Sequence, residues 1–188
     1  MLAAALLLTA CTSGKKAGAP ATSAAGQATG TASAPLKVQV EAAAQGPERG
    51  FDAKVAAKRA TPDMERFLSR YLTVAFLDPG QQRTGWRELL ALFDVPVQQA
   101  ARRDLDALSL GTAAAQVKAV QPGPAKAAVT FLYQGSRPVG ATVKLAFDGA
   151  ADVEQGSGPV RLRSVLQLLW TAKGWRIASY QSQTGASA

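Results

Sequence analysis

Alternation of apolar and polar residues near the C-terminal end of the chain constrains its fold more than any other feature. Residues 160–171 and 175–181 both show this period of two, and residues 172–174 between them are typical of a tight hairpin turn. A two-residue loop would place the apolar residues of both segments on one face: Leu166, Leu168, Trp170, Trp175 and Ile177. We therefore predict an antiparallel hairpin with one apolar face, which must pack against another part of the chain.

Further strands are predicted upstream of this hairpin. Residues 139–147 alternate in the same way, whereas residues 116–120 and 126–133 are two shorter runs that flank a turn at residues 121–124. Residues 36–40 also alternate and indicate a short strand near the start of the folded region. The C-terminal half of the chain is therefore expected to form four or five antiparallel strands.

Three amphipathic helices are predicted between residues 61 and 110. Thr61 is expected to be the N-cap of the first helix and Pro62 its first helical residue. The apolar residues that follow recur at helical spacing: Met64, Phe67, Leu68, Tyr71, Leu72, Ala75 and Phe76. A second helix is predicted over residues 84–93, and a third begins at Pro96 and ends before Gly111.

Helices followed by strands predict an α+β fold, with the N-terminal helices packed on a curved antiparallel sheet. This order, together with Gly-Trp-Arg-Ile at residues 174–177, resembles the cone-shaped fold of nuclear transport factor two and ketosteroid isomerase. The resemblance covers residues 61–181 and implies a pocket between helices and sheet, where enzymes of that fold place an acid or base. Residues 36–60 are expected to be a lead-in without defined structure, and residues 182–188 a flexible tail.

The chain contains no His and a single Cys, Cys11. The folded region therefore lacks the side chains for His/Cys metal and haem sites, for triads with a His base and for Cys nucleophiles. We expect no cofactor and no metal. The formal net charge is +8, which is typical of proteins that bind nucleic acid or anionic surfaces. Because the basic residues are scattered, an anionic lipid or wall polymer is favoured over nucleic acid.

Residues 1–10 are an apolar stretch typical of a signal peptide and too short to span a bilayer, which takes about 20 residues. Leu-Thr-Ala-Cys at residues 8–11 resembles the lipobox of bacterial lipoproteins, whose Cys becomes the N-terminus and carries diacylglycerol. The resemblance implies a lipid-anchored protein on the extracytoplasmic face of the cell membrane. Export signals normally begin with positive charge, so we expect the coding sequence to start upstream of Met1.

Residues 11–35 are expected to be the lipidated Cys and a disordered linker. After Cys11 they contain no aromatic and no large aliphatic residue, so nothing offsets the entropy cost of ordering them. A linker of this length has an average reach of roughly 25–30 Å, which would hold a domain clear of a membrane. Stable attachment takes two acyl chains, and a diacylglyceryl group supplies both.

The acidic residues do not form a catalytic motif. Four of them lie at predicted helix ends or on a polar face, and Asp94 is interpreted as the cap of the helix at Pro96: Asp78, Asp94, Asp104 and Asp106. Asp148, Asp152 and Glu154 lie in a Gly-rich loop, where carboxylates could bind Ca²⁺, but the EF-hand spacing is missing and a solvated loop is favoured.

Two other sets of side chains are candidates for binding. Arg161 and Arg163 share one strand face and could either bind an anion or form part of a soluble surface. Six aromatic residues could line a pocket or pack in the core: Tyr71, Tyr133, Tyr180, Trp86, Trp170 and Trp175.

The sequence favours a lipid-anchored, extracytoplasmic and non-catalytic binding or interaction module, with an envelope protein or an apolar ligand as its partner. Two alternatives stay open. One is a small His-independent enzyme, similar to an isomerase or hydratase, that uses Asp and Tyr in a cone-shaped pocket. The other is a carrier for an apolar ligand. A closed pocket with a buried carboxylate would favour the enzyme, whereas a filled cone would favour the module.

Replacing Cys11 tests the anchor directly. In a bacterial host, Cys11→Ala should release the protein from the membrane fraction or block its processing, because the only lipid acceptor is gone. Fractionation and metabolic labelling with a fatty-acid probe measure both outcomes. Unchanged membrane retention of the variant, or an unlabelled wild-type protein, would rule out acylation at Cys11.

Overall fold

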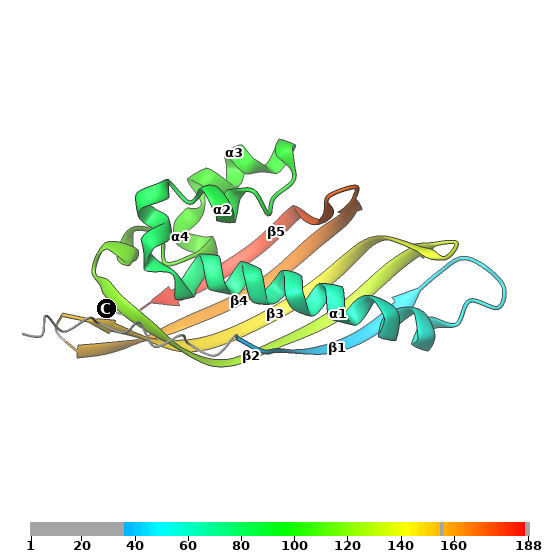
Figure 1. Cartoon of the computed structure of the whole chain (residues 1–188), viewed down its shortest axis with the longest axis horizontal. Helices are drawn as coiled ribbons and strands as arrows, with labels where there is room; N and C mark the ends of the chain where they lie inside the picture. Colours follow the sequence, from blue (N-terminus) through cyan, green and yellow to red (C-terminus); the bar gives the residue numbers. More distant parts are fainter. Residues whose placement is uncertain (1–35, 155, 187–188) are drawn as a thin grey trace, which may run out of the picture. The chain divides into compact units, whose positions relative to one another are not determined.

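The computed structural model describes residues 36–154 and 156–186. Within them, helices pack on one five-stranded sheet, which confirms the α+β class (Figure 1). The elements in chain order are β1 Val38–Gln45, α1 Ala53–Leu72, η1 Thr73–Leu77, η2 Pro79–Thr84, α2 Arg87–Leu90, α3 Val95–Arg103, α4 Leu105–Leu108, η3 Gly111–Ala115, β2 Val117–Gln134, β3 Arg137–Val153, β4 Gly156–Thr171 and β5 Gly174–Ala186. The expected signal peptide and tether, Cys11 included, lie outside the described residues.

The five strands follow their chain order across the sheet, but the sheet is mixed rather than antiparallel. β1 runs parallel to β2, and the three other neighbouring pairs are antiparallel. A parallel pair cannot be joined by a hairpin, and here all the helices lie between β1 and β2 in the chain. The short strand predicted at residues 36–40 is confirmed as the start of β1, whereas the rest of the lead-in, residues 41–60, is better defined than expected and holds the end of β1 and the first turns of α1.

The main helix, α1, begins eight residues before the predicted cap (Ala53 against Thr61). Asp52 is the N-cap, and its carboxylate accepts a 3.0 Å hydrogen bond from the backbone N–H of Val55. Pro62 lies inside the helix, and the Thr61 hydroxyl donates to the carbonyl of the preceding turn instead of capping. A proline inside a helix costs about 3 kcal/mol. Burial of the long apolar stripe on both sides of Pro62 offsets this cost.

The predicted turn at residues 121–124 is part of a continuous strand. β2 passes through it with a shift in register between Pro122 and Ala125, so that the strand bends without leaving the sheet. Gly123 permits this bend, because a Cβ at that position would lie 2.5 Å from the backbone oxygen of Asp148. Proline is tolerated at such a bulge, where a ladder hydrogen bond is already missing.

The C-terminal hairpin has the predicted register next to its turn. Trp170 pairs with Trp175 and Leu168 pairs with Ile177. A bulge then shifts the register, so that Leu166 lies opposite Tyr180. The predicted flexible tail is wrong for most of its length, because β5 continues to residue 186 and stays paired with β4.

The helices after α1 are shorter than predicted. Gly85 and Trp86 both have positive φ angles (64° and 58°), which interrupt the helix expected over residues 84–93 and leave only the four-residue α2. The third predicted helix is divided at Asp104 into α3 and α4. The segment between α2 and α3 contacts the free edge of β5: the Ile177 N–H donates to the Leu92 oxygen at 2.9 Å. This contact protects an otherwise open sheet edge.

One apolar core fills the space between α1, the short helices and the sheet. The largest fully buried side chains come from all of these elements: Tyr71, Phe76, Phe93, Phe131, Phe147, Met64, Leu68, Leu72, Leu89, Leu108, Leu162 and Leu166. Figure 1 shows α1 lying along one face of the sheet, and buried residues of α1 and of the strands belong to the same apolar cluster. Among the described residues, none of the helices has the length and apolar character that crossing a membrane requires.

The position of the α1 cap can be tested by substitution. Asp52→Ala should lower the free energy of unfolding by about 1 kcal/mol, because it removes the acceptor for the Val55 N–H at the start of the helix. Asp52→Asn keeps an acceptor and should retain most of the stability. Chemical denaturation with constant m-values measures both changes.

Thr61→Ala is the matched control. The Thr61 hydroxyl donates to a carbonyl that already accepts a hydrogen bond within the helix. Removing this hydroxyl should therefore lower the free energy of unfolding by no more than about 0.5 kcal/mol. If Thr61→Ala is the more destabilising of the two alanine variants, the helix begins at the predicted cap after all.

Candidate functional site

The acidic residues lie where they can support structure rather than catalysis. All thirteen Asp and Glu residues of the chain are described, and each is exposed or only half-buried. The Asp78 carboxylate accepts from Gly80 and Gln81, and Asp106 accepts from the backbone N–H of Thr112 at 2.7 Å. Asp94 is the N-cap residue of α3 as predicted, but its side chain forms no capping hydrogen bond.

Tyr180 and Asp104 form a hydrogen bond between β5 and the segment that joins α3 to α4. The Tyr180 hydroxyl donates to Asp104 Oδ2 at 2.7 Å, and the Tyr180 ring packs edge-on against Phe93 with centroids 5.6 Å apart. Burial of the phenol, with the Asp104 hydrogen bond and charge, raises the pKa of Tyr180 to about 12. A phenol held neutral in this way is a structural donor and is poorly suited to act as a base at neutral pH.

Asp148, Asp152 and Glu154, for which the sequence favours a solvated loop over a Ca²⁺ site, do not share one loop, and only Glu154 lies in the turn after β3. Asp148 and Asp152 lie within β3, and Asp152 accepts a 3.3 Å hydrogen bond from Gln121 on β2. Within residues 36–154 and 156–186, no group of three His, Cys, Asp or Glu side chains is placed to hold a metal ion.

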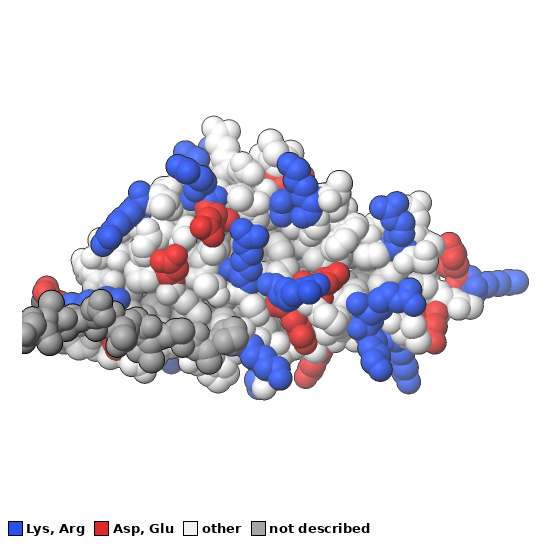
Figure 2. Space-filling view, viewed as in Figure 1, with Lys and Arg blue, Asp and Glu red and all other residues white. Residues whose placement is uncertain are grey.

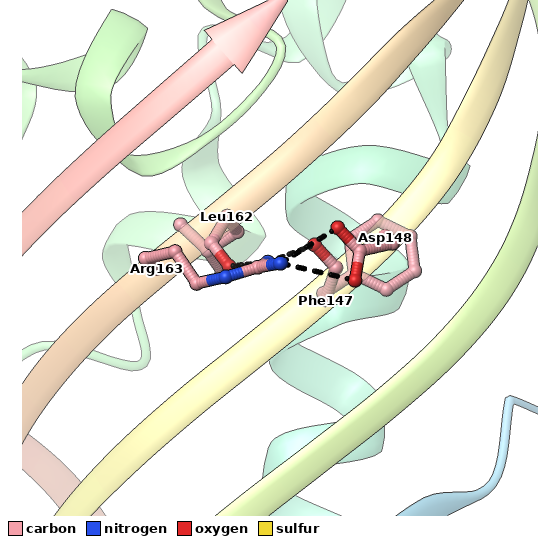
Figure 3. Close-up of polar contacts among 4 residues, drawn as sticks. All are labelled: Phe147, Asp148, Leu162 and Arg163. Carbon is pink, nitrogen blue, oxygen red and sulfur yellow. Dashed lines mark hydrogen bonds and ion pairs between the residues drawn. The ribbon is translucent and has the colours of Figure 1, made fainter.

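Arg163 is engaged by its neighbours and is not free to bind an anion (Figure 3). Its Nη2 donates to both carboxylate oxygens of Asp148 at 2.9 and 3.1 Å, and its Nη1 donates to the carbonyls of Phe147 and Leu162. Arg161 shares the exposed side of β4, as predicted. The two arginines therefore belong to a solvated sheet face. Arg163 is paired with Asp148, whereas Arg161 forms no ion pair with any described residue.

Three of the six aromatic candidates meet in a pocket of about 220 Å³ between α1 and the hairpin ends of the sheet. Tyr133 comes from the end of β2, and Trp170 and Trp175 come from either side of the β4–β5 turn. The two indoles pack edge to face, with centroids 4.9 Å apart. The other three aromatic candidates lie elsewhere: Tyr71 and Trp86 in the core, and Tyr180 at the α3–α4 junction.

A second pocket of about 250 Å³ adjoins the first one. Both pockets are lined by Arg59, Tyr133 and Ser136, and the second one also includes Phe51 and Val55. The Phe51 ring packs on Tyr133 with centroids 5.3 Å apart. We call the two adjoining pockets the aromatic groove. It runs between the N-terminal half of α1 and the β2–β3 turn.

The charged groups of the aromatic groove are unevenly distributed: Glu48 and Asp52 line the pocket beside Phe51, whereas the pocket beside Trp170 and Trp175 is lined by Arg59, Arg137 and Asp63. Arg59 and Arg137 form no ion pair with any residue that the structure describes, whereas Asp63 is paired with Arg66. The Trp175 Nε1–H is buried and has no acceptor among the described residues. On the face that carries α1, Lys and Arg outnumber Asp and Glu (Figure 2). The Trp170–Trp175 pocket is therefore the part of the groove that is complementary to a ligand with acceptors and negative charge.

Tyr133 is fixed in the centre of the groove. Its hydroxyl donates to the Ala56 carbonyl on α1 at 2.9 Å, which ties the hairpin end of β2 to the helix. Burial raises the pKa of Tyr133, and the nearby charge of Arg59 acts in the opposite direction. The wall of the groove is thus held in place by the fold itself and needs no ligand to form.

A larger hollow of about 780 Å³ lies at the other end of the sheet, where β2 and β4 begin. Its lining is short and polar, with Gly156, Ser157, Gly158 and Pro159 on one side and Lys118 on another. Its described lining contains no aromatic side chain, and Lys118 and Glu154 are its two charged residues. The smaller aromatic groove therefore offers more specific recognition chemistry than the larger hollow.

The sequence identified only part of this groove. Trp170, Trp175 and Tyr133 were candidates because aromatic residues often line pockets, but Phe51, Arg59 and Arg137 were missed. Phe51 and Arg59 come from the segment expected to lack structure. Their sequence signal is the cap and helix-forming run at residues 52–60, which would have extended α1 toward the hairpin ends.

Comparison with known proteins adds no assignment: no family model, curated protein or solved structure matches the chain. The residues and their geometry therefore carry the functional conclusion.

The chain has three tyrosines, and burial raises the pKa of each one. In the native protein, absorbance near 295 nm should therefore show each phenol titrating above the ordinary value of about 10. A raised folded-state pKa stabilises the protein below about pH 10, and this contribution is lost as the pH rises through about 12. Unfolding in strong base should release all three phenols together.

The same titration in denaturant is the control, and there all three phenols should ionise near pH 10. One native tyrosine that titrates at its ordinary value would show that its surroundings differ from those described.

Proposed function

We propose that this chain is an exported lipoprotein, anchored through Cys11 on the extracytoplasmic face of the cell membrane, whose folded domain is a non-catalytic binding module. The lipobox resemblance at residues 8–11 supports the anchor, and the linker that follows supports a domain held off the membrane. The partners in this proposal are the membrane, through the lipid, and another envelope component, through the domain. Nucleic acid has no part in it.

The observation that carries the non-catalytic assignment is the filled face of the sheet. Phe131, Phe147 and Leu162 are fully buried against the helices, and none of the thirteen carboxylates is buried. An acid or base that works in a water-excluded chamber needs such burial to shift its pKa toward neutrality. The recognition chemistry lies instead in the open aromatic groove, where bulky apolar rings and cations favour binding.

We also propose that the helices and curved sheet form the cone-shaped fold of nuclear transport factor two and ketosteroid isomerase. The helices that precede β2 and the long antiparallel strands β2 to β5 support this proposal. The bulges in β2 and β5 support the curvature that such a cone requires.

Both alternatives have less support. A His-independent enzyme would need an Asp and a Tyr in an enclosed pocket, but the Tyr180–Asp104 pair involves an exposed carboxylate. A carrier for an apolar ligand would need an enclosed apolar cavity, typically of about 300–1,000 Å³. The two pockets of the aromatic groove, of about 220 and 250 Å³, are open rather than enclosed, and charged residues line both of them.

Native mass spectrometry of the membrane-extracted protein tests this proposal. The main species should have the mass of the processed chain plus its acyl groups, with no further small molecule bound. If an apolar compound co-purifies at one molecule per chain, the binding-module proposal is wrong and the chain is a carrier for an apolar ligand. If the wild-type chain carries no acyl group, the proposed lipid anchor is wrong. The Cys11→Ala chain supplies the reference mass of an unacylated protein.

A further inference from the structure

We propose that the aromatic groove binds an extended acidic peptide segment of a partner protein, with an apolar side chain in the Trp170–Trp175 pocket and a carboxylate between Arg59 and Arg137. This inference rests on the proposed function as a binding module and specifies the chemistry of its partner. The proposed ligand is therefore a peptide that carries a large apolar side chain close to an acidic one.

The apolar half of the recognition comes from the indole pocket. Trp175 is 97% buried and fixed between Phe131 and Trp170, whereas Trp170 is only half-buried and presents part of its ring to the groove. A volume of about 220 Å³ is too small for a drug-sized ligand but suits one amino-acid side chain. Rigid, partly exposed aromatic rings of this kind are the usual anchors of protein interfaces.

The two arginines of the Trp170–Trp175 pocket select an acidic residue at this end of the peptide, whereas Glu48 and Asp52 line the other end of the groove. Arg59 lies on α1 and Arg137 is the first residue of β3, and both residues line the same pocket. Neither has an ion-pair partner among the described residues, and Asp63 is already paired with Arg66. An added carboxylate would therefore find two cations whose charge is not compensated. Arginine also binds carboxylates bidentately, which fixes orientation as well as charge.

The indole N–H of Trp175 is buried without an acceptor among the described residues, so its position beside the pocket costs free energy. Buried donors almost always have an acceptor, and leaving one without a partner costs about 1–3 kcal/mol. The Nε1 atom belongs to a residue that lines the pocket, and no described residue provides an acceptor for it.

The length of the groove favours an extended chain over a compact ion. Because its two pockets share Tyr133, Arg59 and Ser136, a ligand anchored at Trp170 can continue past Tyr133 toward Phe51. Two pockets along one line are the arrangement that recognises successive side chains of an extended peptide. The walls are a helix and a hairpin joined by the Tyr133–Ala56 hydrogen bond, so the site is formed before the ligand arrives.

Selection from a random ten-residue peptide library on the purified full chain carrying Cys11→Ala tests the proposal. Enriched peptides should contain Asp or Glu within a few positions of an aromatic, proline or large aliphatic residue. Binding of an enriched peptide can be followed by tryptophan fluorescence in a Trp86→Phe background. The two remaining indoles, Trp170 and Trp175, then both report from the groove.

Charge reversal separates this site from the rest of the basic surface. Arg59→Glu and Arg137→Glu should each weaken peptide binding at least tenfold, because a cation that faces the carboxylate becomes an anion. Arg161→Glu is the matched control on the opposite, exposed face of the sheet and should change binding less than twofold. Trp170→Ala should also weaken binding at least tenfold, with circular dichroism confirming that the variant is folded.

Three outcomes overturn the inference. The first is enrichment of peptides that lack an acidic residue, and the second is equal loss of binding in Arg137→Glu and Arg161→Glu. The third is that the selection enriches no peptide at all. This outcome includes the case in which Arg59 and Arg137 instead bind the protein to vesicles that contain anionic lipid. Each leaves the proposed function standing, because native mass spectrometry and the Cys11→Ala chain test the anchored module separately.

Discussion

Packing of one helix on one face of the sheet holds this domain together. Met64, Leu68 and Tyr71 of α1 are fully buried against the strands, and the chain has no second Cys with which to form a disulfide. Truncating a buried side chain of this size typically costs about 2–5 kcal/mol, which is a large part of the stability of an ordinary domain. The Tyr71 hydroxyl also donates to the Leu108 carbonyl at 3.1 Å, so the same helix fixes the position of α4.

The aromatic groove is a consequence of where this helix begins. If α1 started at Thr61, Arg59 would not be placed by the helix and Tyr133 would lose its acceptor, the Ala56 carbonyl. The eight added residues carry α1 over the hairpin ends, where the strands present Tyr133, Trp170 and Trp175. The groove is therefore made of regular elements, and its aromatic side chains are ordered at little further entropy cost.

Electrostatics divides the surface into two parts. On the outer sheet face, Arg163 is neutralised by Asp148, and this pair is exposed enough to contribute little to stability. On the face that carries α1, Arg59 and Arg137 have no such partner among the described residues. The net charge of +8 favours anionic partners in general. The location of these two arginines beside aromatic rings is what gives the proposed site its specificity.

Local patterns in the sequence were sufficient for the α+β class, the register next to the hairpin turn and the buried stripe of α1, because each depends on residues close together in the chain. The tertiary structure decided the rest. Whether Asp52 or Thr61 caps α1, and whether residues 121–124 turn or bend within β2, depends on distant contacts, such as that between Gly123 and Asp148. The groove depends on such contacts most of all, because it joins Arg59, Tyr133 and Trp170, which only the packing of α1 against the sheet brings together.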